Sequence, residues 1–112
     1  RIVEAECTGA SIEDKMNVAN AIINRVNNDE FPSTIKEVVF QKTGKVYQFS
    51  PIADRRYYSV EITDETKQAC EQIFTQKDTT DGAIYFHSSK GSNWISRNRT
   101  YLFSDNSHKF YK

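Results

Sequence analysis

The sequence has no net charge and no long apolar run. Its 15 Lys and Arg residues equal its 15 Asp and Glu residues, so no global field attracts nucleic acid or an anionic membrane. No segment approaches the roughly 20 consecutive apolar residues of a membrane span, and none has the pattern of a signal peptide. We therefore expect no nucleic-acid partner and no membrane insertion.

Cysteine and histidine are scarce, with two residues of each. Cys7 and Cys70 could form one disulfide, but we expect both to be free, small, buried residues. The two histidines, His87 and His108, have no HExxH spacing, and the cysteines form no CxxC pair. The sequence therefore predicts no metal ion and no cofactor.

The length of the chain suits a single core. Its 112 residues predict one domain, residues 1–112. The sequence has seven Phe and six Tyr residues but a single Met. This composition suits a small aromatic core and leaves further aromatic residues for a binding surface. Since the chain opens at Arg1, we expect a processed protein or an excised domain, and we expect a monomer.

Helices are expected in the first two thirds of the chain. The clearest is an amphipathic helix of about 14 residues that begins after Ser11 and has apolar residues at spacings of three and four. A short helix over residues 2–8 precedes it and is stopped by Gly9. Further helices are expected over residues 34–40 and from Thr63 onward, with a polar loop between them.

Strands are expected only after the turn pair Asp81-Gly82. Three short β-rich runs follow, over residues 83–86, 100–103 and 109–111. Because helices come first and strands last, the order predicts an α+β fold with a small antiparallel sheet.

Two glutamates near the N-terminus cannot share a face of the first helix, because each residue turns about 100°. Glu6 follows Ile2 by four positions and Val3 by three, so it lies on their apolar stripe beside Cys7, with Glu4 expected on the opposite side. A carboxyl group partly removed from water has a raised pKa and can act as a general acid. An ordinary charge at a helix end is the alternative.

Six short blocks of sequence bear on this choice. In order they are Ala5-Glu6-x-x-Gly9, Asn24-Arg25-Val26, Phe31-Pro32-x-Thr34-Ile35-x-x-Val38-Val39-x-Gln41, Gln48-Phe49-Ser50-Pro51, Gly82-Ala83-x-Tyr85-Phe86 and His108-x-Phe110-Tyr111. Together they resemble the catalytic domain of the SleB-type spore cortex-lytic cell wall hydrolases over nearly the whole chain.

This resemblance implies a lysozyme-like α+β fold, with N-terminal helices packed against a small antiparallel sheet. It also implies cleavage of peptidoglycan between N-acetylmuramic acid and N-acetylglucosamine, generally as a lytic transglycosylase. The catalytic glutamate of the family falls on Glu6. The family commonly has Glu where this chain has Ala10, and a small or basic residue where it has Cys7. The first difference puts a secondary carboxylate near the site in doubt.

Transglycosylation needs only one carboxylate, which protonates the bridging oxygen and then accepts a proton from the muramyl C6 hydroxyl. Hydrolysis usually takes two carboxylates, and Glu13, Asp54 and Asp64 remain candidates for the second. A hydrolytic muramidase or glucosaminidase is therefore an alternative, as is a noncatalytic peptidoglycan-binding module. A thiol enzyme, with Cys7 as nucleophile and His87 or His108 as base, is a third class.

Six further residues are candidates for substrate binding: Gln48, Phe49, Ser50, Tyr85, Phe86 and His108. Gln48 and Ser50 supply an amide and a hydroxyl on a loop. Tyr85 is expected to face the site and Phe86 the core, because neighbours on a strand alternate. Each candidate also has a structural alternative. Residues 48–50 could form a turn that buries the Phe49 ring, Tyr85 and Phe86 could belong to a purely structural sheet, and His108 could be a hydrogen-bonded histidine at the end of a strand.

Other polar and aromatic residues allow two interpretations. Arg25 is expected to tie the long helix to a loop. Five further residues could line a sugar-binding groove or could be ordinary surface residues: Arg55, Arg56, Tyr57, Tyr58 and Trp94. From the resemblance we expect an extracytoplasmic protein of the cell wall or spore cortex, of bacterial or phage origin, whose partner is the peptidoglycan glycan strand.

Overall fold

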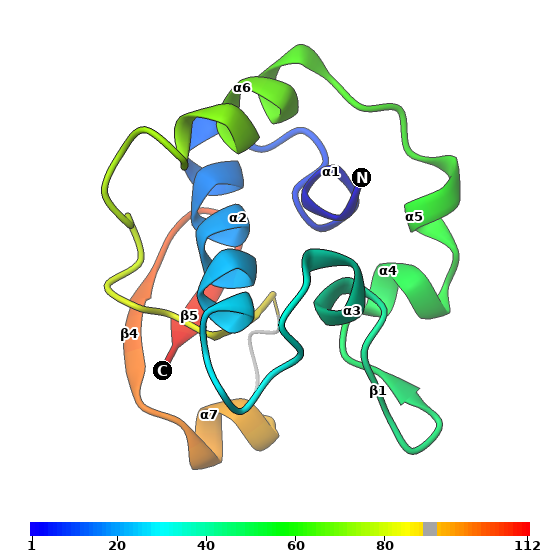
Figure 1. Cartoon of the computed structure of the whole chain (residues 1–112), viewed down its shortest axis with the longest axis vertical. Coiled ribbons are helices and arrows are strands. Elements are labelled where there is room, and N and C mark those ends of the chain that lie inside the picture. The colour runs from blue at the N-terminus through cyan, green and yellow to red at the C-terminus, as the bar shows by residue number, and fades with distance from the viewer. Residues whose placement is uncertain (89–91) are drawn as a thin grey trace.

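The longest helix, α2 (Ile12–Val26), passes through the middle of the molecule (Figure 1). In this computed structural model, which describes residues 1–88 and 92–112, the helix begins where the sequence predicts. The Ser11 side chain accepts a hydrogen bond from the backbone N–H of Asp14, which satisfies one of the free donors of the first turn. Val18 and Ala21 are fully buried.

Two shorter helices pack beside α2. Helix α1 (Ile2–Glu6) is two residues shorter than predicted, and Gly9 adopts a φ of 76° just after it, a conformation that glycine enters without strain. Helix α6 (Asp64–Gln72) begins at Thr63, whose side chain accepts from the N–H of Thr66, as predicted. Helix α1 is enclosed on almost every side, because its residues 2–5 are all buried.

The predicted short helix near residue 35 is confirmed as α3 (Ile35–Val39), capped by Thr34. Its expected apolar stripe is only partly confirmed, because Val38 and Val39 are buried but Ile35 is 49% exposed.

The predicted loop after α3 contains more structure than expected. Thr43 pairs with Val46 around Gly44, whose φ is 62°, and two single-turn helices follow. The elements are β1 (Lys42–Thr43), β2 (Val46–Tyr47), α4 (Ser50–Ala53) and α5 (Arg56–Ser59). Segments this short have no periodicity to detect, so the sequence did not indicate them.

The C-terminal third forms a three-stranded antiparallel sheet. Its strands are β3 (Tyr85–His87), β4 (Tyr101–Ser104) and β5 (Lys109–Tyr111), in the order β3-β5-β4. A short helix, α7 (Trp94–Asn98), lies between β3 and β4 in the chain. Helices with a small antiparallel sheet confirm the predicted α+β class.

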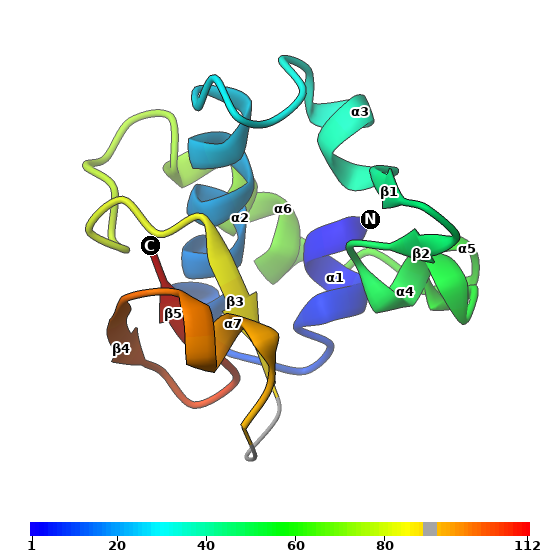
Figure 2. The ribbon, with the colours of Figure 1, turned by 90° about the horizontal axis from the view of Figure 1, so that it is seen from below.

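Aromatic side chains join the sheet to the helices. The ring of Phe86 lies 5.7 Å from that of Phe49 and 5.8 Å from that of Phe110, and all three are buried. Figure 2 shows the end of α1 between β3 on one side and the β1–β2 hairpin with α4 on the other.

Both cysteines are free, as expected. Cys7 is buried, as expected, but Cys70 is only partly buried. Within the described residues, no helix is both long and apolar enough to cross a membrane.

Candidate active site

A cleft of about 270 Å³ opens where the end of α1 meets β3, β2 and α4. Glu6 lines it, together with four residues that the sequence indicated for substrate binding: Gln48, Phe49, Ser50 and Phe86. Residues from three distant parts of the chain therefore meet at one carboxylate.

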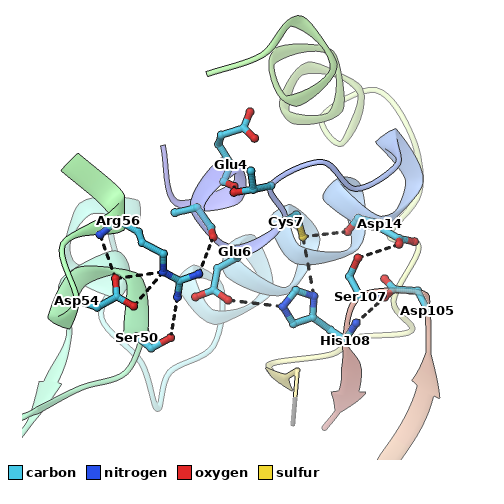
Figure 3. A network of polar contacts seen from close by, with 12 residues as sticks. Glu4, Glu6, Cys7, Asp14, Ser50, Asp54, Arg56, Asp105, Ser107 and His108 are labelled. Atoms are coloured by element: carbon cyan, nitrogen blue, oxygen red, sulfur yellow. Dashed lines mark hydrogen bonds and ion pairs between the residues drawn. The ribbon is translucent and has the colours of Figure 1, made fainter. Parts of the chain in front are cut away.

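Glu6 is the last residue of α1, and its side chain is 13% exposed. Its Oε2 atom lies 3.6 Å from Nε2 of His108, and Figure 3 shows the carboxylate between that ring and the Arg56 cluster. Among the described residues that line the cleft, Glu6 is the one carboxylate. The Glu6 carboxyl group can therefore exchange a proton with a ligand in the cleft, although most of the side chain is shielded from water.

The sequence places Glu4 on the side of α1 opposite the apolar stripe, where a carboxylate would be expected to face solvent. The structure shows that it is buried instead. It is only 1% exposed, because α6 covers that side of α1. Its Oε1 accepts hydrogen bonds from the Thr63 N–H at 2.9 Å, the Thr63 hydroxyl at 2.8 Å and the Thr66 hydroxyl at 2.7 Å. Its Oε2 lies 3.9 Å from Nζ of the buried Lys15.

The pKa of Glu4 reflects two opposing effects. Burial raises it, but the hydrogen bonds from Thr63 and Thr66 and the charge of Lys15 together bring it below its ordinary value. Glu4 is therefore a structural anion that faces α6. The two glutamates do lie on different faces of α1, and both are removed from water.

His108 does not line the cleft of Glu6. Its side chain is only 2% exposed; Nε2 faces Glu6, and Nδ1 lies 3.9 Å from Sγ of Cys7. The backbone N–H of His108 donates to Oδ1 of Asp105 at 2.8 Å, which fixes the start of β5. The ring therefore supports the carboxylate, whereas the sequence suggested contact with substrate.

Cys7 lies beside this pair and is 3% exposed. Burial, reinforced by the negative charges of Glu6, Asp105 and Asp14, raises the pKa of the Cys7 thiol to about 12. A thiol that remains protonated at neutral pH is a poor nucleophile. The arrangement therefore argues against a thiol enzyme.

Arg25 connects α2 to the segment before β3, as expected of a residue that ties the long helix to a loop. Its Nε donates to the carbonyl of Ile84 at 2.6 Å, and its guanidinium carbon lies 5.0 Å from the ring centroids of both Phe31 and Phe49. Burial lowers its pKa to about 10, while Tyr85 and Glu6 act in the opposite direction. Arg25 also lines the cleft, which the sequence did not indicate.

None of the three candidates for a second carboxylate is among the described residues that line the cleft: Glu13, Asp54 and Asp64. Asp54 is occupied by Arg56, whose Nε lies 2.9 Å from its Oδ2. Hydrogen bonds from the backbone and side chain of Arg56, together with its charge, lower the pKa of Asp54. Arg56 also donates to the carbonyl of Ala5 at 3.4 Å and to the hydroxyl of Ser50 at 3.3 Å (Figure 3), so it joins α5 to α1 and α4.

Tyr85 faces a second cleft, of about 380 Å³, beside that of Glu6. Trp94 lines this second cleft as well. The other four groove candidates line neither cleft among the described residues: Arg55, Arg56, Tyr57 and Tyr58. Phe86 is buried in the core, as expected of its position on β3, and it also forms part of the wall beside Glu6. Tyr85 faces the neighbouring cleft and does not line that of Glu6.

Within the described residues, no group of three or more His, Cys, Asp or Glu side chains is arranged to hold a metal ion.

Nearly the whole chain matches one protein family. The profile described as Cell Wall Hydrolase matches residues 9–111. The chain belongs to the cell wall hydrolase family. The match begins at Gly9, so Glu6 lies just outside it.

Individual relatives agree with the family. A spore cortex-lytic enzyme of Oceanobacillus iheyensis is 28% identical over 95 residues, which cover 83% of this chain and 33% of that protein. The chain thus spans about a third of the length of this curated relative.

Two solved structures share the fold. The catalytic domain of the germination-specific lytic transglycosylase SleB from Bacillus anthracis superposes with a TM-score of 0.81 at 25% identity, covering 99% of this chain and 88% of that one. The catalytic domain of Bacillus cereus SleB gives a TM-score of 0.79 at 26% identity, covering 99% and 84%. The fold is therefore that of the SleB catalytic domains, as the six sequence blocks predicted.

Proposed function

We propose that residues 1–112 act as one catalytic domain that cleaves the peptidoglycan glycan strand between N-acetylmuramic acid and N-acetylglucosamine. The reaction is that of a lytic transglycosylase, with Glu6 as the proton donor. The observation that carries the proposal is the position of Glu6, a largely shielded carboxylate at the wall of a cleft. The likeness to the catalytic domain of a germination-specific lytic transglycosylase supports the same chemistry here.

The reaction needs one group that first donates and then accepts a proton. Protonated Glu6 transfers its proton to the bridging oxygen as the bond between that oxygen and the muramyl C1 breaks. The resulting carboxylate takes the proton of the muramyl C6 hydroxyl, and O6 bonds to C1. The products are a 1,6-anhydromuramyl end and a free hydroxyl on the leaving sugar, and Glu6 ends protonated.

A single carboxylate in the cleft favours this reaction over hydrolysis. Glycoside hydrolysis usually places a second carboxyl group roughly 5–9.5 Å from the first. Asp54 is engaged by Arg56 and is half exposed, while Glu13 and Asp64 lie outside the described lining of the cleft.

The remaining lining residues suit an N-acetylated sugar. Gln48 offers an amide and Ser50 a hydroxyl for the acetamido and hydroxyl groups of the sugar. Phe49 and Phe86 give the cleft an apolar wall, which excludes water and strengthens electrostatic interactions with Glu6. His108 acts through Glu6, by holding the carboxylate from behind.

We place the activity outside the cytoplasmic membrane, on the cell wall or the spore cortex, with a monomer as the working form. The similarity to a spore cortex-lytic enzyme and to a germination-specific lytic transglycosylase supports this substrate.

The test is mass spectrometry of purified sacculi digested by the wild-type protein and by Glu6→Gln. We expect muropeptides with anhydromuramyl ends from the wild type and a fall in rate of about 10²- to 10⁴-fold in the variant, with binding to sacculi retained. Glu13→Gln, at an exposed position of α2, is the matched control.

Reducing muramyl or glucosaminyl ends would instead identify a hydrolase. Binding without any product from the wild type would identify a noncatalytic module. Full activity of Glu6→Gln would refute the role of Glu6.

A further inference from the structure

The second cleft continues the cleft of Glu6. Gln48 and Ile95 line both spaces, so a ligand can extend from one into the other. At about 270 and 380 Å³, the two together are of the size of ordinary ligand sites, roughly 300–1,000 Å³. The substrate proposed above is a polymer, so the sugars that flank the cleaved bond also need a place.

The second cleft has an exposed aromatic ring at its edge. Trp94, the first residue of α7, is 53% exposed. The start of this helix is fixed by a capping box, in which the Asn93 side chain accepts from the Ser96 N–H at 2.9 Å and the Ser96 hydroxyl accepts from the Asn93 N–H at 2.8 Å. The backbone that carries the indole is therefore held in place.

The rings themselves are also held. The centroid of Tyr85 lies 6.3 Å from that of Trp94 and 5.8 Å from that of Phe31. The guanidinium carbon of Arg99 lies 4.7 Å from the Tyr85 ring and 5.3 Å from the Trp94 ring. A ring that is ordered before binding loses little entropy when a ligand packs on it.

The polar groups of this cleft are mostly neutral. Gln41, Thr43 and Gln48 line it, and Oε1 of Gln41 is buried without a hydrogen-bond partner among the described residues. Glu30 is the one charged side chain among the described lining residues. Aromatic rings with amides and hydroxyls suit a neutral sugar. The negative charge of Glu30 is countered by the guanidinium of Arg99 against the Tyr85 and Trp94 rings, so the cleft has no strong charge of one sign that would select the carboxylates of a peptide stem.

We propose that the second cleft binds a neutral 2-acetamido sugar of the glycan strand, next to the sugar at Glu6, with Trp94 stacked on its pyranose ring. This assignment rests on the proposed function, because it takes the glycan strand as the ligand. It makes Trp94 a determinant of strand binding, while Glu6 carries the chemistry.

The sequence provides a direct probe, because Trp94 is its single tryptophan. The intact Glu6→Gln chain is titrated with a peptide-free tetrasaccharide of alternating N-acetylglucosamine and N-acetylmuramic acid, with calorimetry to measure binding. We expect the tryptophan emission to shift to shorter wavelength and acrylamide quenching to fall about twofold or more, since stacking covers an exposed ring. The stem peptide alone should change neither signal.

Kinetics supply the second measurement. Trp94→Ala should raise KM for long glycan strands about tenfold, the loss expected for one stacked ring, and leave kcat nearly unchanged. Trp94→Phe should recover most of the binding. Phe74→Ala is the matched control, because Phe74 is 70% exposed and lies outside both clefts. Thermal unfolding of each variant reports on folding.

The outcomes separate the two proposals. Suppose that the wild type forms product, but the Trp94 fluorescence does not respond to bound tetrasaccharide or responds to the stem peptide instead. Either result overturns the assignment of the second cleft and leaves the proposed function intact. A tryptophan that responds to the tetrasaccharide, in a protein whose wild type forms no product, refutes the proposed function and supports sugar binding. An unchanged KM in folded Trp94→Ala also overturns the assignment.

Discussion

Glu6 and His108, from opposite ends of the chain, meet with 3.6 Å between Oε2 and Nε2. The ring is held from its other side as well, since Nδ1 lies 3.9 Å from the Cys7 sulfur and the Phe86 ring packs nearly perpendicular to it, with 5.2 Å between the ring centroids. Its orientation is therefore set before any ligand enters the cleft.

His108 is accordingly predicted to be a positioning residue. His108→Ala should lower kcat about 10- to 100-fold, because the Glu6 carboxylate loses the polar ring 3.6 Å away that orients it and a small misplacement of a reacting group is costly, with KM little changed. His108→Gln, which can place an amide N–H near the position of Nε2, should restore part of the rate. Steady-state kinetics on solubilised glycan strands measure both. A purely structural role predicts instead that lost activity follows lost stability, which urea unfolding of the two variants would reveal.

Glu4 is predicted to stabilise the fold without taking part in cleavage. Glu4→Gln should lower the free energy of unfolding by about 1–3 kcal/mol at neutral pH, because Lys15 loses its buried partner and the Thr63 and Thr66 donors lose a charged acceptor. Glu71→Gln, at an exposed position of α6, should stay within about 0.5 kcal/mol of the wild type. Urea unfolding monitored by circular dichroism gives these values.

The same glutamate predicts a pH dependence. Its pKa is lower in the folded chain than its ordinary value, so its contribution is present above the ordinary pKa and is lost as pH falls through the folded one. The wild type and Glu4→Gln should therefore converge in stability in acid. A constant gap between them from neutral to strongly acidic pH would contradict this account.

Cys7 is predicted to be dispensable for cleavage. The thiol is buried and its pKa is raised to about 12, so iodoacetamide at neutral pH should leave it unmodified in the folded protein. Cys7→Ala should keep most of the wild-type rate, because the thiol takes no part in the reaction and Phe86 still packs against the His108 ring. Mass spectrometry of the alkylated protein, together with the rate of sacculus clearing, tests both statements. Loss of turnover in folded Cys7→Ala would revive the thiol mechanism.

Arg25 is predicted to matter for stability through its contact with Ile84. Arg25→Met keeps most of the apolar stem but leaves the Ile84 carbonyl without its donor at 2.6 Å, which should cost about 1–3 kcal/mol. Lys67→Met, at an exposed position of α6, is the control. Urea midpoints of the two variants give the comparison, and equal midpoints would show that the contact contributes nothing.

Local features of the sequence predicted local features of the fold. Ser11 and Thr63 cap the helices that they were expected to cap, because a cap depends on residues three positions apart. Gly9 takes the left-handed conformation for the same local reason. The β1–β2 hairpin was missed because a pair of two-residue strands has no pattern that distinguishes it from a polar loop.

Burial was harder to predict than secondary structure. Periodicity separates the faces of α1 but does not say what covers each face. Glu4 was expected on the solvated side, yet α6 brings Thr63 and Thr66 to it. Tyr85 and Phe86 do alternate on β3, but the neighbouring helices and loops determine which of them lies next to Glu6.

The sequence by itself determined the α+β class, the caps and ends of the main helices, and the likeness to the SleB-type catalytic domain, because these depend on neighbouring residues or on motifs in order. Only the tertiary structure decided that Glu4 is paired with Lys15, that His108 lies behind Glu6, and that the cleft of Glu6 continues past Gln48 to Trp94. Those relationships join residues far apart in the chain, and their distances are set by how the helices and the sheet pack together.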